Sequence, residues 1–575
     1  MMAPGENIHS IWELGSRQIT AQLCILSTVQ AEQTPKRVTM VGVLAIGAAA
    51  AAALLPWIHY GIPSGHDFEF HLNSWIEVRD HWQQGVIYPH WAAWAHYGYG
   101  EARFLFYPPI SWTIGGILGA ILPWKMVPAA FVWLALMLAG LSMLVLARNW
   151  LSPSSALFAA VLYTLNPYHL LIIYWRSAFA ELLTAAYLPL LVLCLLHLEE
   201  YGKRIIAPLA LLLAAGWLTN IPGAIMMHYS LGILVVWLAI YRRRGRVLGY
   251  AGIAVFAAAA LAAVYLLPVL HQKAWVSLDQ VLSPGVRPQE NFLFAHTQDA
   301  DHDKFNHLVS MIAAWEFALF AFVQVLWRGK QAAKLWWPVL VLGVSCALLM
   351  LPFTTMLWRD LPPLRYVQFP WRWLVVLNLV LSLAIAAAVR SWWRRILIFG
   401  LALAPVAIGA HWMLMPWWDT AADVRELVDN HSDQVGDEGV DEYAPAGTDP
   451  YDVDHNVPLA RLDGAGPAKV TIQRWDDEHR VIAATSGSGG KLVLRLFNYP
   501  LWRVSVSGRP TTPETGPHGE MLVPLIAGDS QIEIVFREGW DRLAGAIISL
   551  ASFAALGLWH SRCKPRHAFH ESSRP

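Results

Sequence analysis

Charged residues are scarce in this chain. Only 14% of its 575 residues are Asp, Glu, Lys or Arg, whereas soluble globular proteins carry about 25%. Hydrophobic residues make up 56% of the chain. This balance excludes an ordinary soluble domain and favours a chain that lies largely within a lipid bilayer. Acidic and basic residues number 41 each, so the basic excess that attracts nucleic acid is missing, and we expect no nucleic-acid partner.

Cysteines are few, and the short motifs of several enzyme classes are absent. The four cysteines are Cys24, Cys194, Cys346 and Cys563. The topology inferred below places none of them in an external loop, so no disulfide framework is expected. The chain contains no glycine-rich phosphate loop, no HExxH and no CxxC pair. These absences argue against ATP hydrolysis, zinc-protease chemistry and thiol redox chemistry.

The first 37 residues lack the apolar core and the cleavage site of a signal peptide. They are polar and mixed, and Lys36 and Arg37 precede the first apolar run. We interpret residues 1–37 as a cytoplasmic, largely disordered N-terminal extension. The alternative is a wrongly assigned start upstream of Met40.

Apolar runs of about 20 residues recur along the chain, and each is long enough to span a bilayer. They predict an all-α polytopic membrane protein with about twelve transmembrane helices. Basic clusters mark the cytoplasmic side, and they place both termini in the cytoplasm. The run at 110–122 is too short to span, so we interpret it as a re-entrant or interfacial helix. The expected spans are residues 38–58, 128–147, 155–174, 181–198, 205–220, 223–241, 247–268, 309–327, 335–356, 371–389, 395–415 and 541–559.

This topology divides the chain into a transmembrane core at 38–415, an external domain at 416–540, and a final helix with a cytoplasmic tail at 541–575. The core carries two large external loops, 59–127 and 271–308.

The external domain is predicted to be rich in β-strands. Leu492, Leu494 and Leu496 recur at every second position, and the segment QIEIVF at 531–536 repeats the pattern. Residues 416–539 contain 21 acidic and 10 basic residues, a net charge of −11. Such a domain is not expected to lie against anionic lipid headgroups.

The segment Gly65 to His71 places ionisable side chains just after the first span. Charges beside a bilayer are costly and therefore suggest function. If residues 67–84 form a helix, Asp67 and His71 lie on one face. Asp67 could then serve as a general base with a raised pKa, or could bind a divalent metal with Glu69 or His71. The alternative is that Asp67 only caps a helix.

Three further segments carry candidate residues. Arg176 and Glu181 lie at the end of a later span, where Arg176 could bind a phosphate; the alternative is an ion pair that anchors the helix ends. Arg365 and Arg372 lie among aromatic residues and would suit an anionic lipid headgroup, unless they are ordinary interfacial arginines. The His- and Asp-rich loop at 296–307 could bind Zn²⁺ or Mn²⁺, but it lacks a fixed ligand spacing and is better interpreted as a solvated, mobile loop.

Several segments resemble known families. One span followed by a large external loop that opens on an acidic residue resembles the layout of GT-C class membrane glycosyltransferases. More closely, the chain resembles a bacterial group described as membrane protein, 6-pyruvoyl-tetrahydropterin synthase-related. The segments that carry this resemblance are GHDFEFHLNSW, RSAFAELLTAAYLPL, LRYVQFPWRWL, EYAPAGTDP and NYPLWRVSVSG. The pterin enzyme itself is a small soluble zinc protein with none of this architecture, so we do not expect that activity.

The resemblance implies a glycosyltransferase in the bacterial inner membrane. Its donor would be a sugar linked to polyprenyl phosphate, and its acceptor a glycan, lipid or protein. Asp67 and Glu181 would be catalytic, Arg176 with Arg365 or Arg372 would bind the lipid phosphate, and Glu69 and His71 would contact substrate. A divalent cation, Mg²⁺ or Mn²⁺, is left open. Two alternatives remain: a flippase for a lipid-linked glycan, and a non-catalytic assembly protein that displays the β-domain.

Overall fold

The structure is a computed structural model that describes residues 36–327, 333–464 and 468–563. The predicted N-terminal extension lies outside this part, apart from its last two residues, with which helix α2 begins. The chain divides into two compact units, residues 1–45 and 46–575. All contacts described below lie within the second unit.

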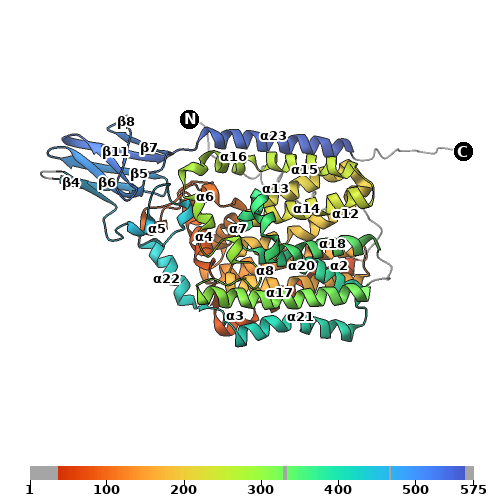
Figure 1. The fold of residues 1–575 in the computed structure, drawn as a ribbon. Helices are drawn as coiled ribbons and strands as arrows, with labels where there is room; N and C mark the ends of the chain where they lie inside the picture. Colours follow the sequence, from red (N-terminus) through yellow and green to blue (C-terminus); the bar gives the residue numbers. More distant parts are fainter. Residues whose placement is uncertain (1–35, 328–332, 465–467, 564–575) are drawn as a thin grey trace. The chain divides into compact units, whose positions relative to one another are not determined.

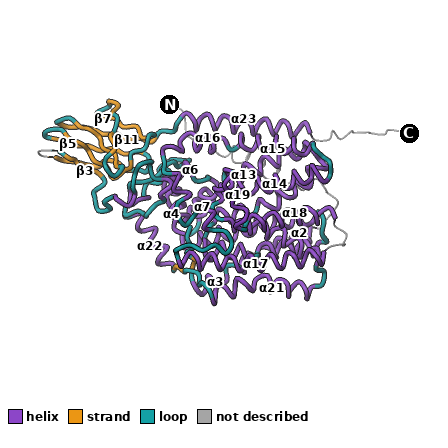
Figure 2. Tube along the Cα trace, in the orientation of Figure 1, coloured by secondary structure: helices purple, strands orange, loops and turns teal. Residues whose placement is uncertain are grey.

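Helices dominate the structure (Figures 1 and 2). Their bounds are α2 Lys36–Ala52, α3 Leu55–Tyr60, α4 Phe68–Gln83, α5 Ala95–Gly98, α6 Arg103–Phe106, α7 Pro109–Ile121, α8 Val127–Arg148, α9 Pro153–Thr164, α10 Pro167–Leu171, α11 Phe179–Thr184, α12 Tyr187–Tyr201, α13 Ile206–Trp217, α14 Ile221–Tyr241, α15 Arg246–Leu261, α16 Ala263–Gln272, α17 Ala300–Trp327, α18 Ala333–Leu349, α19 Thr355–Asp360, α20 Leu374–Ala388, α21 Trp392–Trp412, α22 Ala421–Ser432 and α23 Trp540–Cys563.

Within the described residues, nine helical stretches are long and apolar enough to cross a membrane, or up to eleven if two bent helix pairs each count as one span. The sequence predicted about twelve. The difference arises at Phe179–Trp217, a single stretch of 39 residues in which the sequence suggested two spans. That stretch is divided into α11, α12 and α13, and at 1.5 Å per residue it contains enough residues for about two crossings of the bilayer core. The predicted polytopic helical fold is confirmed.

Burial distinguishes inner from outer helices. In the most apolar part of α20, 94% of the residues are buried, and α20 packs against α9, α17 and α18. In α23 the corresponding share is 6%. A helix that is apolar all round and barely buried by protein must be covered by lipid. Helix α7, at 13 residues, is too short to span, which leaves our re-entrant interpretation as a prediction.

The C-terminal β-rich domain is also confirmed. Its strands are β3 Ala460–Asp463, β4 Ala468–Trp475, β5 His479–Ser486, β6 Gly490–Phe497, β7 Trp502–Val506, β8 Arg509–Thr511, β9 Glu514–Thr515, β10 Glu520–Leu525 and β11 Gly528–Phe536. They form two antiparallel sheets, in the orders β3-β6-β10-β9 and β4-β5-β11-β7-β8. Leu492 and Leu494 from the first sheet and Ile532 and Ile534 from the second are buried in one core, as the alternating pattern predicted.

The segment 59–127, which the sequence predicts to be the first external loop, contributes to this same core. Trp91, Tyr99 and Phe106 lie in it among the strand residues, and Trp91 contacts the rings of Trp502 and Phe536. A short pair of strands, β1 Ile62–Pro63 and β2 Trp418–Asp419, ties the start of the loop to the start of the domain. The loop and the domain therefore pack as one body.

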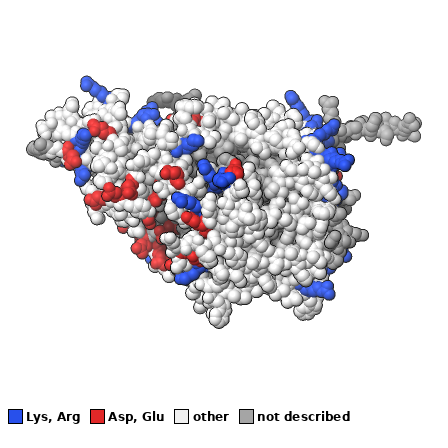
Figure 3. All heavy atoms as spheres, viewed as in Figure 1, with Lys and Arg blue, Asp and Glu red and all other residues white. Residues whose placement is uncertain are grey.

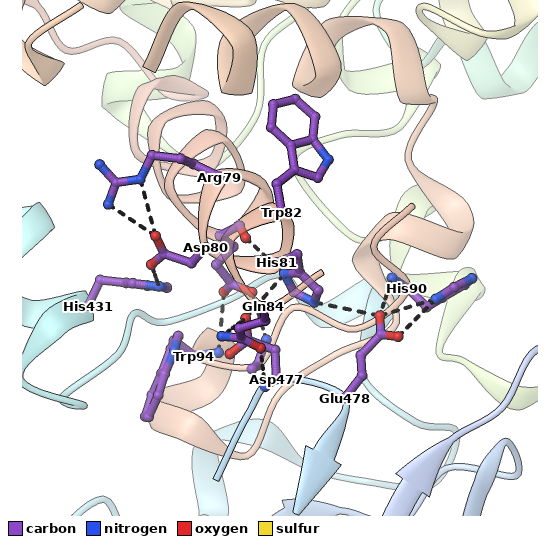
Figure 4. Close-up of polar contacts among 12 residues, drawn as sticks. Arg79, Asp80, His81, Trp82, Gln84, His90, Trp94, His431, Asp477 and Glu478 are labelled. Carbon is purple, nitrogen blue, oxygen red and sulfur yellow. Dashed lines mark hydrogen bonds and ion pairs between the residues drawn. The ribbon is translucent and has the colours of Figure 1, made fainter. Parts of the chain in front are cut away.

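Buried and half-buried ionisable side chains join helix α4 and the loop after it to the domain (Figure 4). We call them the docking cluster, which comprises Glu77, Asp80, His81, His90, His431, Asp477 and Glu478. The His81 ring lies 3.3 Å from Asp477 and 3.5 Å from Glu478. His90 pairs with Glu478 at 3.1 Å and, on its other side, with Glu538 at 2.8 Å. His431 of α22 pairs with Asp80 at 3.0 Å.

The docking cluster should make stability depend on pH. Burial alone would lower the pKa of His81, but Asp477 and Glu478 outweigh it and raise that pKa to about 10 from 6.5. The folded protein then holds a proton that the unfolded chain releases between these values, so the free energy of unfolding should fall as pH rises from about 6.5 to about 10. Thermal unfolding of the detergent-solubilised chain across this range measures the slope.

The matched variants are His81→Gln, which should flatten the slope, and His411→Gln, which removes an exposed histidine at the end of α21 and should leave it unchanged. Equal slopes in both variants would show that the cluster does not carry the pH dependence.

Orientation remains a prediction. On the face shown in Figure 3, acidic residues gather near α22 and the β-strands, and basic residues gather at the other end of the helices. Since basic loops stay in the cytoplasm, a cysteine at position 507 should react with an impermeant maleimide in intact cells. A cysteine at position 245 should react only after permeabilisation. Both cysteines are introduced into a variant without native cysteines. Labelling of position 245 from outside would show that the orientation is opposite to the predicted one.

Candidate functional site

The segments Gly65 to Asp67 and Trp175 to Ser177 are held together by hydrogen bonds from backbone N–H groups of the first segment. The Asp67 N–H donates to the Arg176 carbonyl at 2.9 Å, and the Gly65 N–H donates to the Ser177 hydroxyl at 3.0 Å. That hydroxyl donates in turn to the Pro63 carbonyl at 2.9 Å. Residues 112 positions apart in the chain are thereby fixed at the exits of two spans.

Local backbone irregularity makes this contact possible. Residues Ile172–Arg176 form a π-helix, a rare form that often marks functional sites. Ser177 follows with a left-handed backbone at φ 50°. Gly65 has no room for a side chain, because a Cβ there would lie 2.4 Å from the Trp175 carbonyl oxygen.

Asp67 occupies the N-cap position of α4, yet its side chain makes no capping hydrogen bond. Its carboxylate instead accepts a hydrogen bond from Arg176 Nη2 at 3.0 Å. About 36% of the Asp67 side chain is exposed, against 5% for Arg176. The capping interpretation therefore does not account for this carboxylate.

The expected raised pKa of Asp67 is wrong. Burial would raise the pKa of Asp67, but the nearby Arg176 guanidinium and then His71 outweigh burial and hold it below its ordinary value. Sequence reasoning could not find this, because the arginine is 109 positions away. Asp67 is thus ionised at neutral pH while it is paired.

A second ion pair lies beside the first. Arg372 Nε donates to Glu181 Oε2 at 3.1 Å, and the Tyr168 hydroxyl donates to the other Glu181 oxygen at 2.6 Å. Arg372 Nη1 donates to the Val367 carbonyl and to Gln368 Oε1. Glu181 and Arg372 are 2% and 6% exposed, so this pair is fully engaged within the protein.

One aromatic ring connects the two pairs. The guanidinium of Arg176 lies 5.0 Å from the centre of the Phe369 ring, and that of Arg372 lies 4.6 Å from it. Asp67 and Glu181 thus belong to one chain of contacts, Asp67–Arg176–Phe369–Arg372–Glu181, which we call the paired-arginine cluster. Neither Phe369 nor Tyr168 was among the residues expected from the sequence.

Glu69, His71 and Arg365 are not members of this chain of contacts, although His71 lies near enough to Asp67 to influence its pKa. Glu69 is exposed overall, and partial burial of its carboxyl group together with the nearby Asp419 raises its pKa. His71 is buried among aromatic rings, and burial lowers its pKa to about 4. Arg365 is exposed and lies against its neighbour Tyr366.

Metal-binding arrangements are also not found where the sequence suggested them. Within residues 36–327, 333–464 and 468–563, no three His, Cys, Asp or Glu side chains are arranged to hold a metal ion. Most of the segment 296–307, which the sequence predicts to be a loop, is helical, because α17 begins at Ala300. Asp299 accepts hydrogen bonds from the N–H groups of Asp301 and His302 there.

Because the backbone of residue 175 lies so close to Gly65, adding one methyl group at Gly65 is expected to lower the stability of the protein. Gly65→Ala should force the two segments apart and destabilise the protein by about 1–3 kcal/mol, as overpacking does. Gly232→Ala is the matched control, because a Cβ at that position meets nothing within 4 Å. Apparent melting temperatures in detergent should fall for Gly65→Ala only; an unchanged value would mean that the backbone contact is not needed.

Two solved structures show a partial likeness to this chain. One is the arabinofuranosyltransferase AftD from Mycobacteria, with 19% identity, a TM-score of 0.38, and coverage of 64% of this chain and 27% of that one. The other is an oligosaccharyltransferase from Archaeoglobus fulgidus, with 14% identity, a TM-score of 0.34, and coverage of 66% and 57%. The chain thus spans less than two thirds of each, and at these TM-scores neither likeness carries an argument. No curated protein matches the chain.

A family model described as 6-pyruvoyl-tetrahydropterin synthase related domain, membrane protein, matches residues 104–415, more than half of the chain. The match includes Arg176, Glu181, Phe369 and Arg372, whereas Asp67 lies before it. The chain therefore belongs to the 6-pyruvoyl-tetrahydropterin synthase related family of membrane proteins.

Proposed function

We propose that this protein is a membrane glycosyltransferase that moves a sugar from a polyprenyl-phosphate donor to a glycan, lipid or protein acceptor outside the cytoplasm. The observation that carries the proposal is the Asp67–Arg176 ion pair. It sets a partly exposed carboxylate beside a buried guanidinium at the end of a span, about where a lipid phosphate would lie. The GT-C-like layout of the sequence is consistent with this reaction.

Arg176 suits the phosphate better than Arg372 does. Arg176 Nη1 is buried without a hydrogen-bond partner, and a buried donor of this kind requires an explanation. In Arg372, Nε donates to Glu181 and Nη1 donates to Val367 and Gln368, and none of its nitrogens is among the buried atoms without a partner. Arg176 therefore has hydrogen-bonding capacity left for an anion, and Arg372 with Glu181 would position it through Phe369.

Donor binding would also activate Asp67. A phosphate that takes up the charge of Arg176 removes the main influence that lowers the pKa of Asp67, and its own negative charge raises that pKa further. Asp67 would then accept the proton of the acceptor hydroxyl as its oxygen bonds to the anomeric carbon. The bond from that carbon to the phosphate oxygen breaks, its electron pair stays on the phosphate, and Arg176 stabilises the leaving charge.

A second candidate function is transport of a lipid-linked glycan, which one observation favours. Glu316 is fully buried within α17, where one carboxylate oxygen accepts from Asn378 at 2.8 Å and the other has no partner. An ionisable residue inside a span is often functional in transporters. Glu316→Gln should abolish glycan translocation in proteoliposomes if the protein is a transporter, and should leave sugar transfer unchanged if it is a transferase.

Loss of the Asp67 carboxylate should abolish most of the transfer activity. Asp67→Asn keeps the size of the side chain but removes its basicity, so the rate should fall about 10²–10⁴-fold. Glu181→Gln should slow transfer as well, because it removes the charge partner of Arg372. The assay is transfer from a radiolabelled polyprenyl-phosphate sugar in nanodiscs, with thermal unfolding measured alongside.

Glu69→Gln is the matched control, since it changes an exposed carboxylate two residues away. It should keep activity within a few-fold of the parent. A well-folded Asp67→Asn variant with parental activity would reject Asp67 as the base, and loss of activity in Glu69→Gln alone would transfer that role to Glu69.

A further inference from the structure

A cavity of about 230 Å³ lies where the first external loop meets the β-domain. Its floor is the outer face of the β3–β6–β10 sheet, on which Arg461 is paired in register with Val493. The segment 452–458 and Tyr99 close it from the other side. The cavity is somewhat smaller than the sites of about 300–1,000 Å³ that hold drug-sized ligands, and it suits one small ring.

The lining offers both hydrogen-bond donors and acceptors. The carboxylates come from Asp452, Asp454 and Glu520, and the guanidinium groups from Arg461 and Arg495. The charges nearly balance, so the site does not favour an anion or a simple cation. These carboxylates also do not form a metal site, since no three acidic or histidine side chains in the described residues could hold one.

Internal contacts fix several of these groups in place. Glu520 is only 8% exposed, and its Oε2 accepts from the His518 N–H at 2.9 Å. His518 is held in turn by Asp452 at 3.0 Å. The Tyr99 side chain is 5% exposed, and its hydroxyl donates to the Asp454 carbonyl at 3.2 Å. The polar wall is therefore built before any ligand arrives.

Arg495 retains a free donor. Its Nη2 donates to the Gln434 carbonyl at 2.9 Å, but its Nε is buried without a partner. Its guanidinium lies against Gly98, where an added Cβ would come within 3.0 Å of Nε. The arginine is thus positioned by the first external loop and has hydrogen-bonding capacity left.

We infer that this cavity binds one neutral sugar ring of a glycan. A sugar hydroxyl donates one hydrogen bond and accepts two, so it matches walls that present carboxylates and guanidinium groups together. Val457, Pro458 and Val493 supply apolar surface for the C–H face of the ring. A neutral polyol also avoids the desolvation cost that a net charge would carry into the site.

The cavity is linked to the paired-arginine cluster through the first external loop. Four residues after Tyr99, the Arg103 guanidinium lies 4.9 Å from the centre of the Phe70 ring in α4, the helix that begins beside Asp67. If the proposed transferase function holds, the cavity retains a distal ring of the acceptor glycan while another ring is at Asp67. That role rests on the proposed function, whereas binding itself does not.

Saturation-transfer difference NMR on the full chain in detergent tests the binding. The probes are neutral trisaccharides of glucose, mannose, galactose and arabinofuranose. Alanine is the zwitterionic comparison, and the phosphate is methyl phosphate, an anion whose methyl protons can be observed. We expect saturation transfer to at least one trisaccharide and none to alanine or phosphate. No transfer to any trisaccharide, or stronger transfer to alanine or phosphate, would overturn the inference.

Matched variants locate the signal. Glu520→Gln keeps the shape of the wall, and Arg461→Gln changes an exposed position, so both should fold and should weaken the signal at least five-fold. Arg509→Gln, on an exposed strand of the other sheet, should not change it. A signal unaltered by Glu520→Gln and Arg461→Gln would place binding elsewhere. Asp67→Asn should bind like the parent, so that loss of transfer and loss of glycan binding are separate results.

Discussion

The ion pair between Asp67 and Arg176 is the interaction on which the rest of this account depends. It is not a chance surface contact, because backbone hydrogen bonds from Gly65 and Asp67 to residues 176 and 177 set its geometry. The two partners differ in exposure, because Asp67 is partly exposed to solvent and Arg176 is buried. An arginine in this position needs a negative partner, since an unpaired buried charge costs several kcal/mol, about 3–5. The carboxylate supplies that partner, and a phosphate would supply it equally well.

The β-domain contributes to this site by holding the first external loop. Its core includes Trp91 and Tyr99 of that loop, and the docking cluster attaches the β4–β5 turn to α4 through His81 and to the loop after α4 through His90. Since α4 carries Asp67 at its start, the domain fixes the orientation of the proposed base. The domain therefore helps to position the proposed site, in addition to presenting its own exposed surface. Its own cavity adds a place where a glycan chain could be held along the same loop.

Much of the fold could be predicted from local patterns. Runs of apolar residues located the spans, and two-residue alternation located β6 and β11, because both signals depend only on neighbours in sequence. The helix after Asp67 also agrees with its pattern, beginning at Phe68 and ending at Gln83. The motifs at 65–71, 176–181 and 364–374 supplied the four charged members of the paired-arginine cluster. These motifs were selected because they place charged side chains at the ends of spans, where desolvating a charge costs free energy.

What the sequence could not provide are effects that depend on distant partners. The pKa of Asp67 is lowered rather than raised because Arg176 reaches it across 109 positions. Phe369 looks like an ordinary interfacial aromatic until the fold places both arginines on its ring. His81 and His90 each appear as isolated histidines in the sequence, and their carboxylate partners Asp477, Glu478 and Glu538 come from the distant β-domain. Arg365 and Arg372 both have aromatic neighbours in the sequence, but in the fold Arg365 lies at the surface and Arg372 is buried.

The most direct test of the central claim is a structure of the full chain in nanodiscs with a non-hydrolysable polyprenyl-phosphate sugar analogue. The account predicts that a phosphate oxygen lies within hydrogen-bond distance of the Arg176 guanidinium, that the Asp67–Arg176 contact lengthens, and that the anomeric carbon faces Asp67. A phosphate bound at another set of residues, with the Asp67–Arg176 pair unchanged, would contradict it.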